Sequence, residues 1–181
     1  MGTKLNALTP TLECFIKKQA LFFVGTAATE GNVNISPKGS DSFRIINKHK
    51  IVWLNLTGSG NETAAHLIKN NRMTIMFCAF EGKPLILRLY GKAIIYHKRD
   101  VEFHKYEVLF PKNAGARQII EMDIDFIQTS CGYSVPFMDF KEDRNQLNSW
   151  AEKQGETKIE EYWKQKNTTS IDGFDTKKIV E

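Results

Sequence analysis

The sequence lacks the features that would place it among secreted or membrane proteins. Its three cysteines form no Cys-x-x-Cys pair, and their odd number leaves at least one thiol unpaired in any intrachain disulfide scheme. A reducing compartment fits this pattern best. No apolar run approaches the roughly 20 residues of a membrane-spanning helix, and the N-terminus has no apolar signal core. We therefore expect a cytoplasmic protein that does not enter a membrane.

Charge and histidine spacing argue against nucleic-acid and metal binding. The 25 basic and 21 acidic residues leave a scattered net charge of +4, which is too small to predict a nucleic-acid partner. His49, His97 and His104 show no metal-ligand spacing among themselves. A composition of 41% hydrophobic and 25% charged residues is typical of a globular protein, and we expect one domain over residues 1–181.

Short apolar and aromatic runs separated by turn residues predict a mainly β (α+β) fold. The clearest strand covers residues 120–126, where apolar residues at even positions alternate with acidic residues at odd ones. Helices are expected near 9–16 and 100–110, and a charged helical extension at about 142–167 is broken by Gly155. Because these helices do not alternate regularly with the strands, the pattern favours a closed antiparallel barrel over a parallel doubly wound sheet.

The segment from Thr57 to Leu67 has the order strand, glycine loop, helix start, which is a phosphate-binding arrangement. Glycines allow backbone N–H groups to approach an anion, and the helix N-terminus adds a favourable dipole. The segment is neither a P-loop nor a Rossmann fingerprint, because it lacks Gly-Lys-[Ser/Thr] and a third glycine. The alternative is an exposed turn in which Asn61 caps a helix.

A lysine follows a proline at the end of an earlier strand. The run from Ile35 to Gly39 delivers Lys38 to a position where a ligand anion could lie, and a mobile ammonium group suits a phosphate. The alternative is a solvated lysine in a surface turn.

Several segments, taken in order and spacing, resemble the pyridoxamine 5'-phosphate oxidase-related FMN-binding proteins. The resemblance covers about residues 10 to 170, and the joint order of the segments is more specific than any single one. The segments that carry it are Asn34–Gly39, Ile51–Leu54, Thr57–Thr63, Asn70–Phe77 and Leu87–Ala93, and Ser130–Met138 and Ser170–Gly173 are similar to one branch of uncharacterised members.

The resemblance implies a six-stranded antiparallel split β-barrel with peripheral helices. It also implies a homodimer with one FMN in each of two clefts at the subunit interface. FMN would lie along the strand that ends at Lys38, with its phosphate near that lysine and the glycine loop. The cofactor-binding residues expected on this basis are Asn34, Ile35, Ser36, Lys38, Leu54, Asn55, Thr57, Gly58, Asn61, Thr63 and Arg88.

The sequence departs from the true oxidases at their phosphate and substrate contacts. Val33 stands where they have an arginine, Asn61–Thr63 replaces a Ser-Arg-Lys run, and Ile86 replaces a glutamine. Their C-terminal Arg-x-His segment has no counterpart, so we do not expect oxidation of pyridoxine phosphate. Arg88 is one residue that could restore the missing positive charge, although a structural salt bridge explains it equally well.

The function expected from these observations is that of an FMN-dependent oxidoreductase. Flavin would perform hydride or electron transfer, and the protein would bind and orient it. The residues nominate no catalytic acid or base, no substrate and no electron donor. One alternative is a flavin or tetrapyrrole binding and storage module without turnover. Another is a barrel that has lost its cofactor and serves as an interaction domain.

Overall fold

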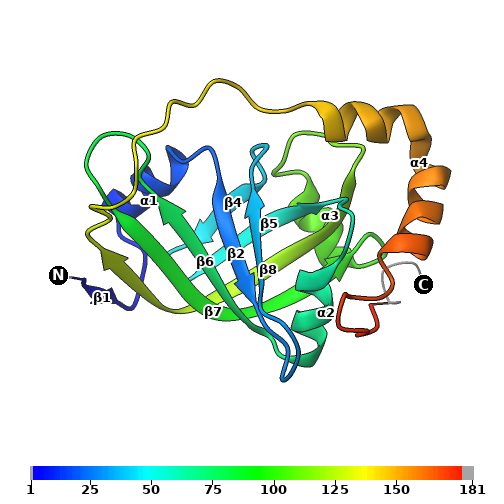
Figure 1. Ribbon diagram of the computed structural model, residues 1–181, viewed down its shortest axis with the longest axis horizontal. Helices are drawn as coiled ribbons and strands as arrows, with labels where there is room; N and C mark the ends of the chain where they lie inside the picture. The colour runs from blue at the N-terminus through cyan, green and yellow to red at the C-terminus, as the bar shows by residue number, and fades with distance from the viewer. Residues whose placement is uncertain (1, 177–181) are drawn as a thin grey trace.

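Eight antiparallel strands form one sheet in the computed structural model, which describes residues 2–176 (Figure 1). The strand order is β3-β2-β6-β7-β8-β5-β4, and β1 pairs with the far end of β8. The strands are β1 (Lys4–Leu5), β2 (Phe22–Thr26), β3 (Asn34–Lys38), β4 (Phe43–Asn47), β5 (Lys50–Leu56), β6 (Arg72–Cys78), β7 (Ile86–His97) and β8 (Ala116–Ser130). The consecutive strands β2 and β3, and likewise β4 and β5, form antiparallel pairs.

The antiparallel split-barrel architecture is confirmed, but the expectations of full closure and of six strands are wrong. Within residues 2–176, the sheet runs from an edge at β3 to an edge at β4 without a pairing between them. Pro37 lies in β3 and has no N–H to donate, which suits an edge strand. The candidate site lies next to the open edge of the sheet at β3.

One face of the sheet encloses the main hydrophobic core. On β7, Leu87 and Leu89 are fully buried, whereas Arg88 and Tyr90 point to the opposite, outer face, as their alternation predicts. Four aromatic rings meet in edge-to-face or tilted contacts at 5.0–6.0 Å between centroids, and these belong to Phe22, Phe43, Trp53 and Phe77. This aromatic cluster fills the interior beside β2.

A bulge in β8 changes which of its residues face the core. Tyr90 pairs with Phe126 but Gly91 pairs with Ile124, so Asp125 is an extra residue in β8. Phe126 therefore lies on the outer face, stacked on Tyr90 at 4.6 Å, and Ile127 is buried in its place. The expectation that Phe126 continues the buried face is wrong for this reason.

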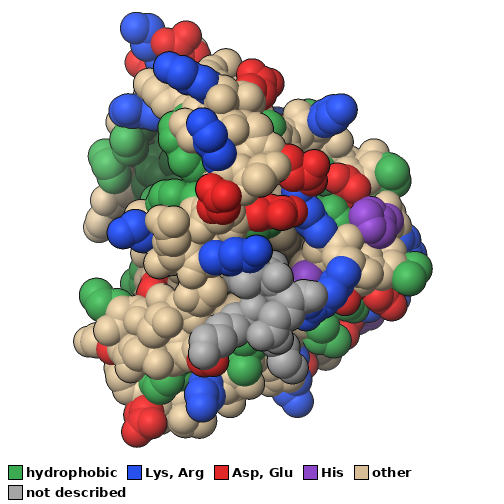
Figure 2. All heavy atoms as spheres, turned by 90° about the vertical axis from the view of Figure 1, so that its right-hand side faces the viewer, with side chains coloured by type: hydrophobic (Ala, Val, Ile, Leu, Met, Phe, Trp, Pro, Cys, Tyr) green, Lys and Arg blue, Asp and Glu red, His purple; other side chains and the backbone are tan. Residues whose placement is uncertain are grey.

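In the described part of the chain, four helices flank the sheet: α1 (Pro10–Lys17), α2 (Glu62–Lys69), α3 (Val101–Glu107) and α4 (Gln146–Lys166). The hydroxyl of Thr9 caps α1 by accepting from the Leu12 N–H, and α4 is interrupted at Gly155, which has φ 74°. In Figure 1, a long segment without strands or helices leads from β8 across one end of the sheet to α4. The face that carries α4 shows interspersed acidic and basic side chains (Figure 2). Among the described residues, no helix is both long and apolar enough to cross a membrane.

Candidate functional site

A pocket of about 510 Å³ opens beside the edge strand β3, and we call it the Lys38 pocket. It collects residues from five parts of the chain that are distant in sequence. Its lining comes from β3, the end of β5, the glycine loop with the start of α2, β8 and a turn near the C-terminus. The residues are Asn32, Val33, Asn34, Ser36, Lys38, Asn55, Gly58, Ser59, Gly60, Asn61, Glu62, Thr63, His66, Arg117, Ile171 and Asp172.

Strand β3 turns its polar side chains toward the pocket because alternate residues share a face. Asn34, Ser36 and Lys38 are half-buried on this face. The amide of Asn34 bonds with the Ser36 hydroxyl at 3.2 Å and donates to Thr63 Oγ1 at 3.4 Å. The ammonium of Lys38 lies 5.3 Å from the centre of the Trp53 ring. Lys38 is thus not the solvated surface lysine of the alternative interpretation.

The glycine loop and α2 form the opposite wall. Asn61 is the N-cap residue of α2, but its side chain makes no capping bond and is buried, with its amide 3.5 Å from the Asn167 carbonyl. The exposed, Asn61-capped turn is therefore not what forms here. His66 is buried in α2, where its Nδ1 bonds with Thr26 Oγ1 at 3.1 Å.

Arg117 is the functional candidate that sequence reasoning missed. Asn55 pairs with Gln118 and Leu56 with Ala116, so a bulge leaves Arg117 unopposed in β8. Its guanidinium donates to the Gly60 carbonyl at 3.0 Å and to Asn167 Oδ1 at 2.6 Å. The side chain is only 4% exposed. A sequence signal did exist, because residues 116–120 do not alternate between polar and apolar as a half-buried strand would.

Two positive charges meet in this pocket. Burial and the nearby Arg117 lower the pKa of Lys38 to about 8. Burial also lowers the pKa of Arg117, but a value of about 9 leaves the guanidinium charged at neutral pH. Within residues 2–176, neither side chain forms an ion pair. Two like charges held out of water without a counter-ion form an attractive site for an anion.

Four further polar atoms in the lining have no protein partner among the described residues. They are Asn55 Oδ1, Asn61 Oδ1, His66 Nε2 and Arg117 Nε, and all are shielded from solvent. Buried polar groups are nearly always hydrogen-bonded in native proteins. Their concentration in one pocket indicates that a polar ligand or bound water completes the bonding there.

The pocket brings together seven of the eleven residues expected to bind a cofactor. These are Asn34, Ser36, Lys38, Asn55, Gly58, Asn61 and Thr63.

The side chains of the other four expected residues lie elsewhere. Ile35 and Arg88 line a hollow on the outer face of the sheet, because Ile35 alternates with the pocket-facing residues of β3 and Arg88 with the core residues of β7. Leu54 is buried against α3, opposite Asn55. Thr57 is buried, and its hydroxyl donates to the Gly115 carbonyl and accepts from Trp163 Nε1, both at 2.9 Å.

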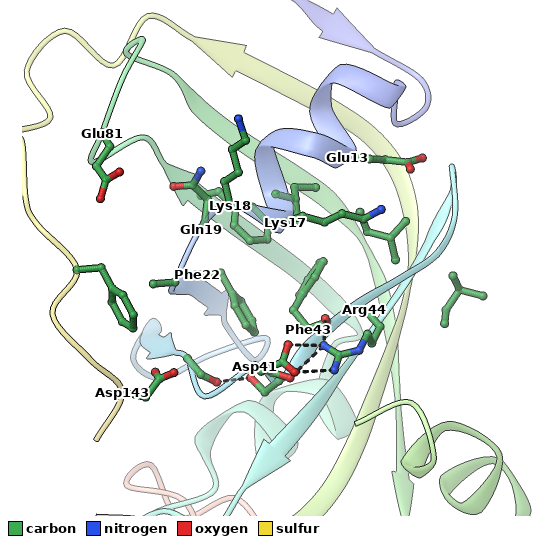
Figure 3. A pocket seen from close by; sticks show the side chains of 18 of the residues that line it. Glu13, Lys17, Lys18, Gln19, Phe22, Asp41, Phe43, Arg44, Glu81 and Asp143 are labelled. Atoms are coloured by element: carbon green, nitrogen blue, oxygen red, sulfur yellow. Dashed lines mark hydrogen bonds and ion pairs between the residues drawn. The ribbon is translucent and has the colours of Figure 1, made fainter. Parts of the chain in front are cut away.

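A larger hollow of about 770 Å³ lies between α1 and β4, with Phe22 and Phe43 on its floor (Figure 3). Its charged groups are already compensated or solvated. Arg44 forms an ion pair with Asp41 at 2.7 Å, and Lys17 at the rim is exposed. The Lys38 pocket is therefore the better candidate for binding an anion, although it is the smaller of the two.

Comparison with known proteins identifies the family. The model of the pyridoxamine 5'-phosphate oxidase family matches residues 8–131. A relative from Aspergillus flavus, the pyridoxamine 5'-phosphate oxidase family protein ustO, is 35% identical over 189 residues, which cover 93% of this chain and 75% of that protein. The chain belongs to the pyridoxamine 5'-phosphate oxidase family. The resemblance inferred from the sequence is thereby confirmed.

Solved structures of this fold agree with the family assignment. HupZ of Group A Streptococcus superposes with a TM-score of 0.53 at 20% identity, covering 66% of this chain and 91% of its own. A candidate pyridoxamine 5'-phosphate oxidase from Lactobacillus delbrueckii gives 0.54 at 17% identity, covering 67% and 93%. The match to the family model includes Lys38, the glycine loop and Arg117, but ends before α4 and the C-terminal wall of the pocket.

Proposed function

We propose that the Lys38 pocket binds FMN and that its phosphate is recognised by Lys38, Arg117 and the glycine loop. The observation that carries this proposal is the pair of cations without a counter-ion, of which Arg117 is buried and Lys38 half-buried. A phosphate dianion would offset their mutual repulsion, and charge-assisted hydrogen bonds to phosphate are about twice as strong as neutral ones. Arg117 would supply the positive charge that the sequence lacks at Val33 and at Asn61–Thr63.

The remaining lining suits the polyol chain of the same cofactor. Asn34, Ser36, Asn55 and Thr63 offer neutral amide and hydroxyl groups, each able to bond with a ligand hydroxyl. Two unpartnered amide oxygens, on Asn55 and Asn61, can accept from hydroxyl groups. A phosphorylated polyol therefore matches both the cationic and the neutral parts of the pocket.

We infer that the activity is that of a flavin-dependent oxidoreductase, which rests on the proposed binding of FMN. A bound flavin supplies hydride or electron transfer. The chain's part is to hold the phosphate, orient the polyol and shield the site from water. The buried ring of His66, fixed by Thr26, offers its Nε2 to the pocket as a further bonding group.

Binding tests the proposal directly. FMN should bind more tightly than riboflavin in a fluorescence titration, because only FMN carries the phosphate. The absorption spectrum of protein purified from cells should show a flavin, and heat should release FMN. Equal affinities for FMN and riboflavin would remove the phosphate argument.

Turnover needs a separate experiment. NADH or NADPH should rapidly bleach the bound flavin, and reoxidation should depend on an added acceptor. Slow bleaching without acceptor dependence would instead favour a storage or carrier module.

A homodimer is also part of this proposal. The outer face of the sheet carries a hollow of about 590 Å³ whose lining includes Ile35, Arg88, Tyr90 and Phe126. Ile35 is 69% exposed, and the stacked rings of Tyr90 and Phe126 lie on the same face. Aromatic and arginine side chains are favoured in interface cores. A second copy covering this face would bury on the order of 2,000 Å², and sedimentation at low micromolar concentration should give about twice 20.7 kDa.

A cytoplasmic location completes the proposal. Cys14, Cys78 and Cys131 are all free thiols in the structure. Free thiols are stable in a reducing compartment. Localisation of the tagged protein in its own cells would test this.

A further inference from the structure

One wall of the Lys38 pocket comes from a turn near the C-terminus, Ser170–Gly173, which we call the C-terminal turn. It is closed by its own bonds: the Gly173 N–H donates to the Ser170 carbonyl at 3.0 Å, and the Phe174 N–H donates to Ser170 Oγ at 3.0 Å. Ile171 and Asp172 line the pocket. Because the family match ends at residue 131, this wall is an addition to the matched barrel.

The tip of the C-terminal turn bridges two other walls of the pocket. The Asp172 carboxylate accepts from the Asn32 backbone N–H at 2.8 Å and from the Asn32 side-chain amide at 2.6 Å. The Ile171 N–H donates to the Glu62 carboxylate at 3.1 and 3.2 Å. The turn thus connects the loop between β2 and β3 with the first residue of α2, across one end of the pocket.

The opposite side of this contact is shaped to receive the carboxylate. Gly31 has φ +82°, which favours glycine, and a Cβ there would lie 2.6 Å from Asp172 Oδ2. Only glycine allows the close approach without displacing the turn. The hairpin loop and the C-terminal turn are therefore complementary in both shape and hydrogen bonding.

The base of the turn is fixed, whereas its tip is exposed. Asn167 is fully buried, accepts from Arg117 and donates to the Gly58 carbonyl at 3.1 Å. Thr176 is buried on the other side and donates to the Asn167 carbonyl. By contrast, Ile171 is 83% exposed, and the tip contacts the rest of the protein mainly through the bonds from Asn32 to the Asp172 carboxylate and from the Ile171 N–H to Glu62. Such a segment can open locally without disturbing the core.

We propose that the C-terminal turn is a hinged cover of the Lys38 pocket, latched by Asp172 on Asn32, and that the ligand enters and leaves when this latch opens. The proposal rests on the proposed function only in taking FMN as the ligand. A latch that blocks both entry and exit predicts a specific kinetic effect. Weakening it should accelerate association and dissociation together, while a lost ligand contact would accelerate dissociation alone.

The experiment measures both FMN rate constants by stopped-flow fluorescence. Asp172→Ala should raise each by about tenfold, a change equivalent to about 1.4 kcal/mol in the latch equilibrium. Gly31→Ala should act in the same direction from the opposite side of the contact. Adding Asn32→Ala to Asp172→Ala should cause little further change, because Asp172→Ala already removes both bonds from Asn32. Glu30→Ala is the control, since it removes an acidic side chain that is exposed in the same loop and does not line the pocket.

Hydrogen exchange on the ligand-free protein tests whether the turn is closed, independently of which ligand binds. The backbone amides of Asn32 and Ile171 should be protected from exchange in the wild type, and the backbone amide of Asn32 should lose this protection in Asp172→Ala. If these amides are unprotected in the wild type, or if Asp172→Ala leaves the association rate unchanged, the cover is refuted. The wild type could also bind no FMN while its Asn32 backbone amide is protected and loses that protection in Asp172→Ala. That outcome would support the closed turn and refute FMN as the ligand.

Discussion

Replacement of Lys38 by methionine should weaken FMN binding while leaving the ligand-free protein at least as stable as the wild type. Methionine keeps most of the volume and the contact with Trp53 but removes the charge. If Lys38 makes one charge-assisted hydrogen bond to the phosphate, its loss costs about 1.5–3 kcal/mol, which raises Kd by roughly 10- to 150-fold. Riboflavin affinity should change much less.

The effect on stability has the opposite sign because Lys38 is a poorly compensated cation. Its pKa of about 8, against an ordinary value of 10.5, corresponds to an unfavourable free energy of up to about 3 kcal/mol at neutral pH. Between these two values the unfolded chain binds more protons, so the stability of the ligand-free wild type should rise with pH. Lys38→Met should abolish this rise and should raise the thermal midpoint by several degrees at pH 7.

The assays are a fluorescence titration and thermal unfolding without ligand, with Lys83→Met as the matched control. Lys83 lies in an exposed turn, so its replacement should change neither quantity. Unchanged FMN affinity in Lys38→Met would make Lys38 a bystander. A lower thermal midpoint of the ligand-free variant would show that the lysine is structural and that the argument from uncompensated charge is mistaken.

Three further predictions concern pH, a buried carboxylate and the bulge. FMN affinity should fall as pH rises through about 8, because Lys38 loses its proton there, and a pH-independent affinity between 7 and 9 would count against its role. Burial would raise the pKa of Glu121, but hydrogen bonds from Lys50 at 2.5 Å and Tyr106 outweigh it, so the pKa lies below its ordinary value. The resulting stability is present above pH 4.5 and is lost as pH falls through the lowered pKa; Glu121→Gln should cost about 1–3 kcal/mol in urea unfolding at pH 7, with a smaller difference in acid. Gly91→Ala should destabilise the sheet severely, because its Cβ would lie 1.9 Å from a backbone oxygen of β8, and unfolding near the wild-type midpoint would show that the bulge can relax.

Local patterns were sufficient for the strands, the phosphate loop and the family. Strand alternation has a period of two residues, so the run around Leu87 could be assigned to buried and outer faces directly. The order of strand, glycine loop and helix also identified one wall of the pocket, because the residues of that wall are neighbours in sequence.

Only the tertiary structure decided the position of Arg117, Phe126 and Asp172. A bulge is defined by the register of two paired strands, so the sequence of β8 alone does not reveal that Asp125 is extra or that Arg117 lies unopposed. The contact of Asn32 with Asp172 joins residues 140 positions apart, and no local periodicity encodes it. The sequence thus determined the secondary structure and the chemistry near Lys38, and strand register and long-range contacts determined which charges meet in the pocket and what covers it.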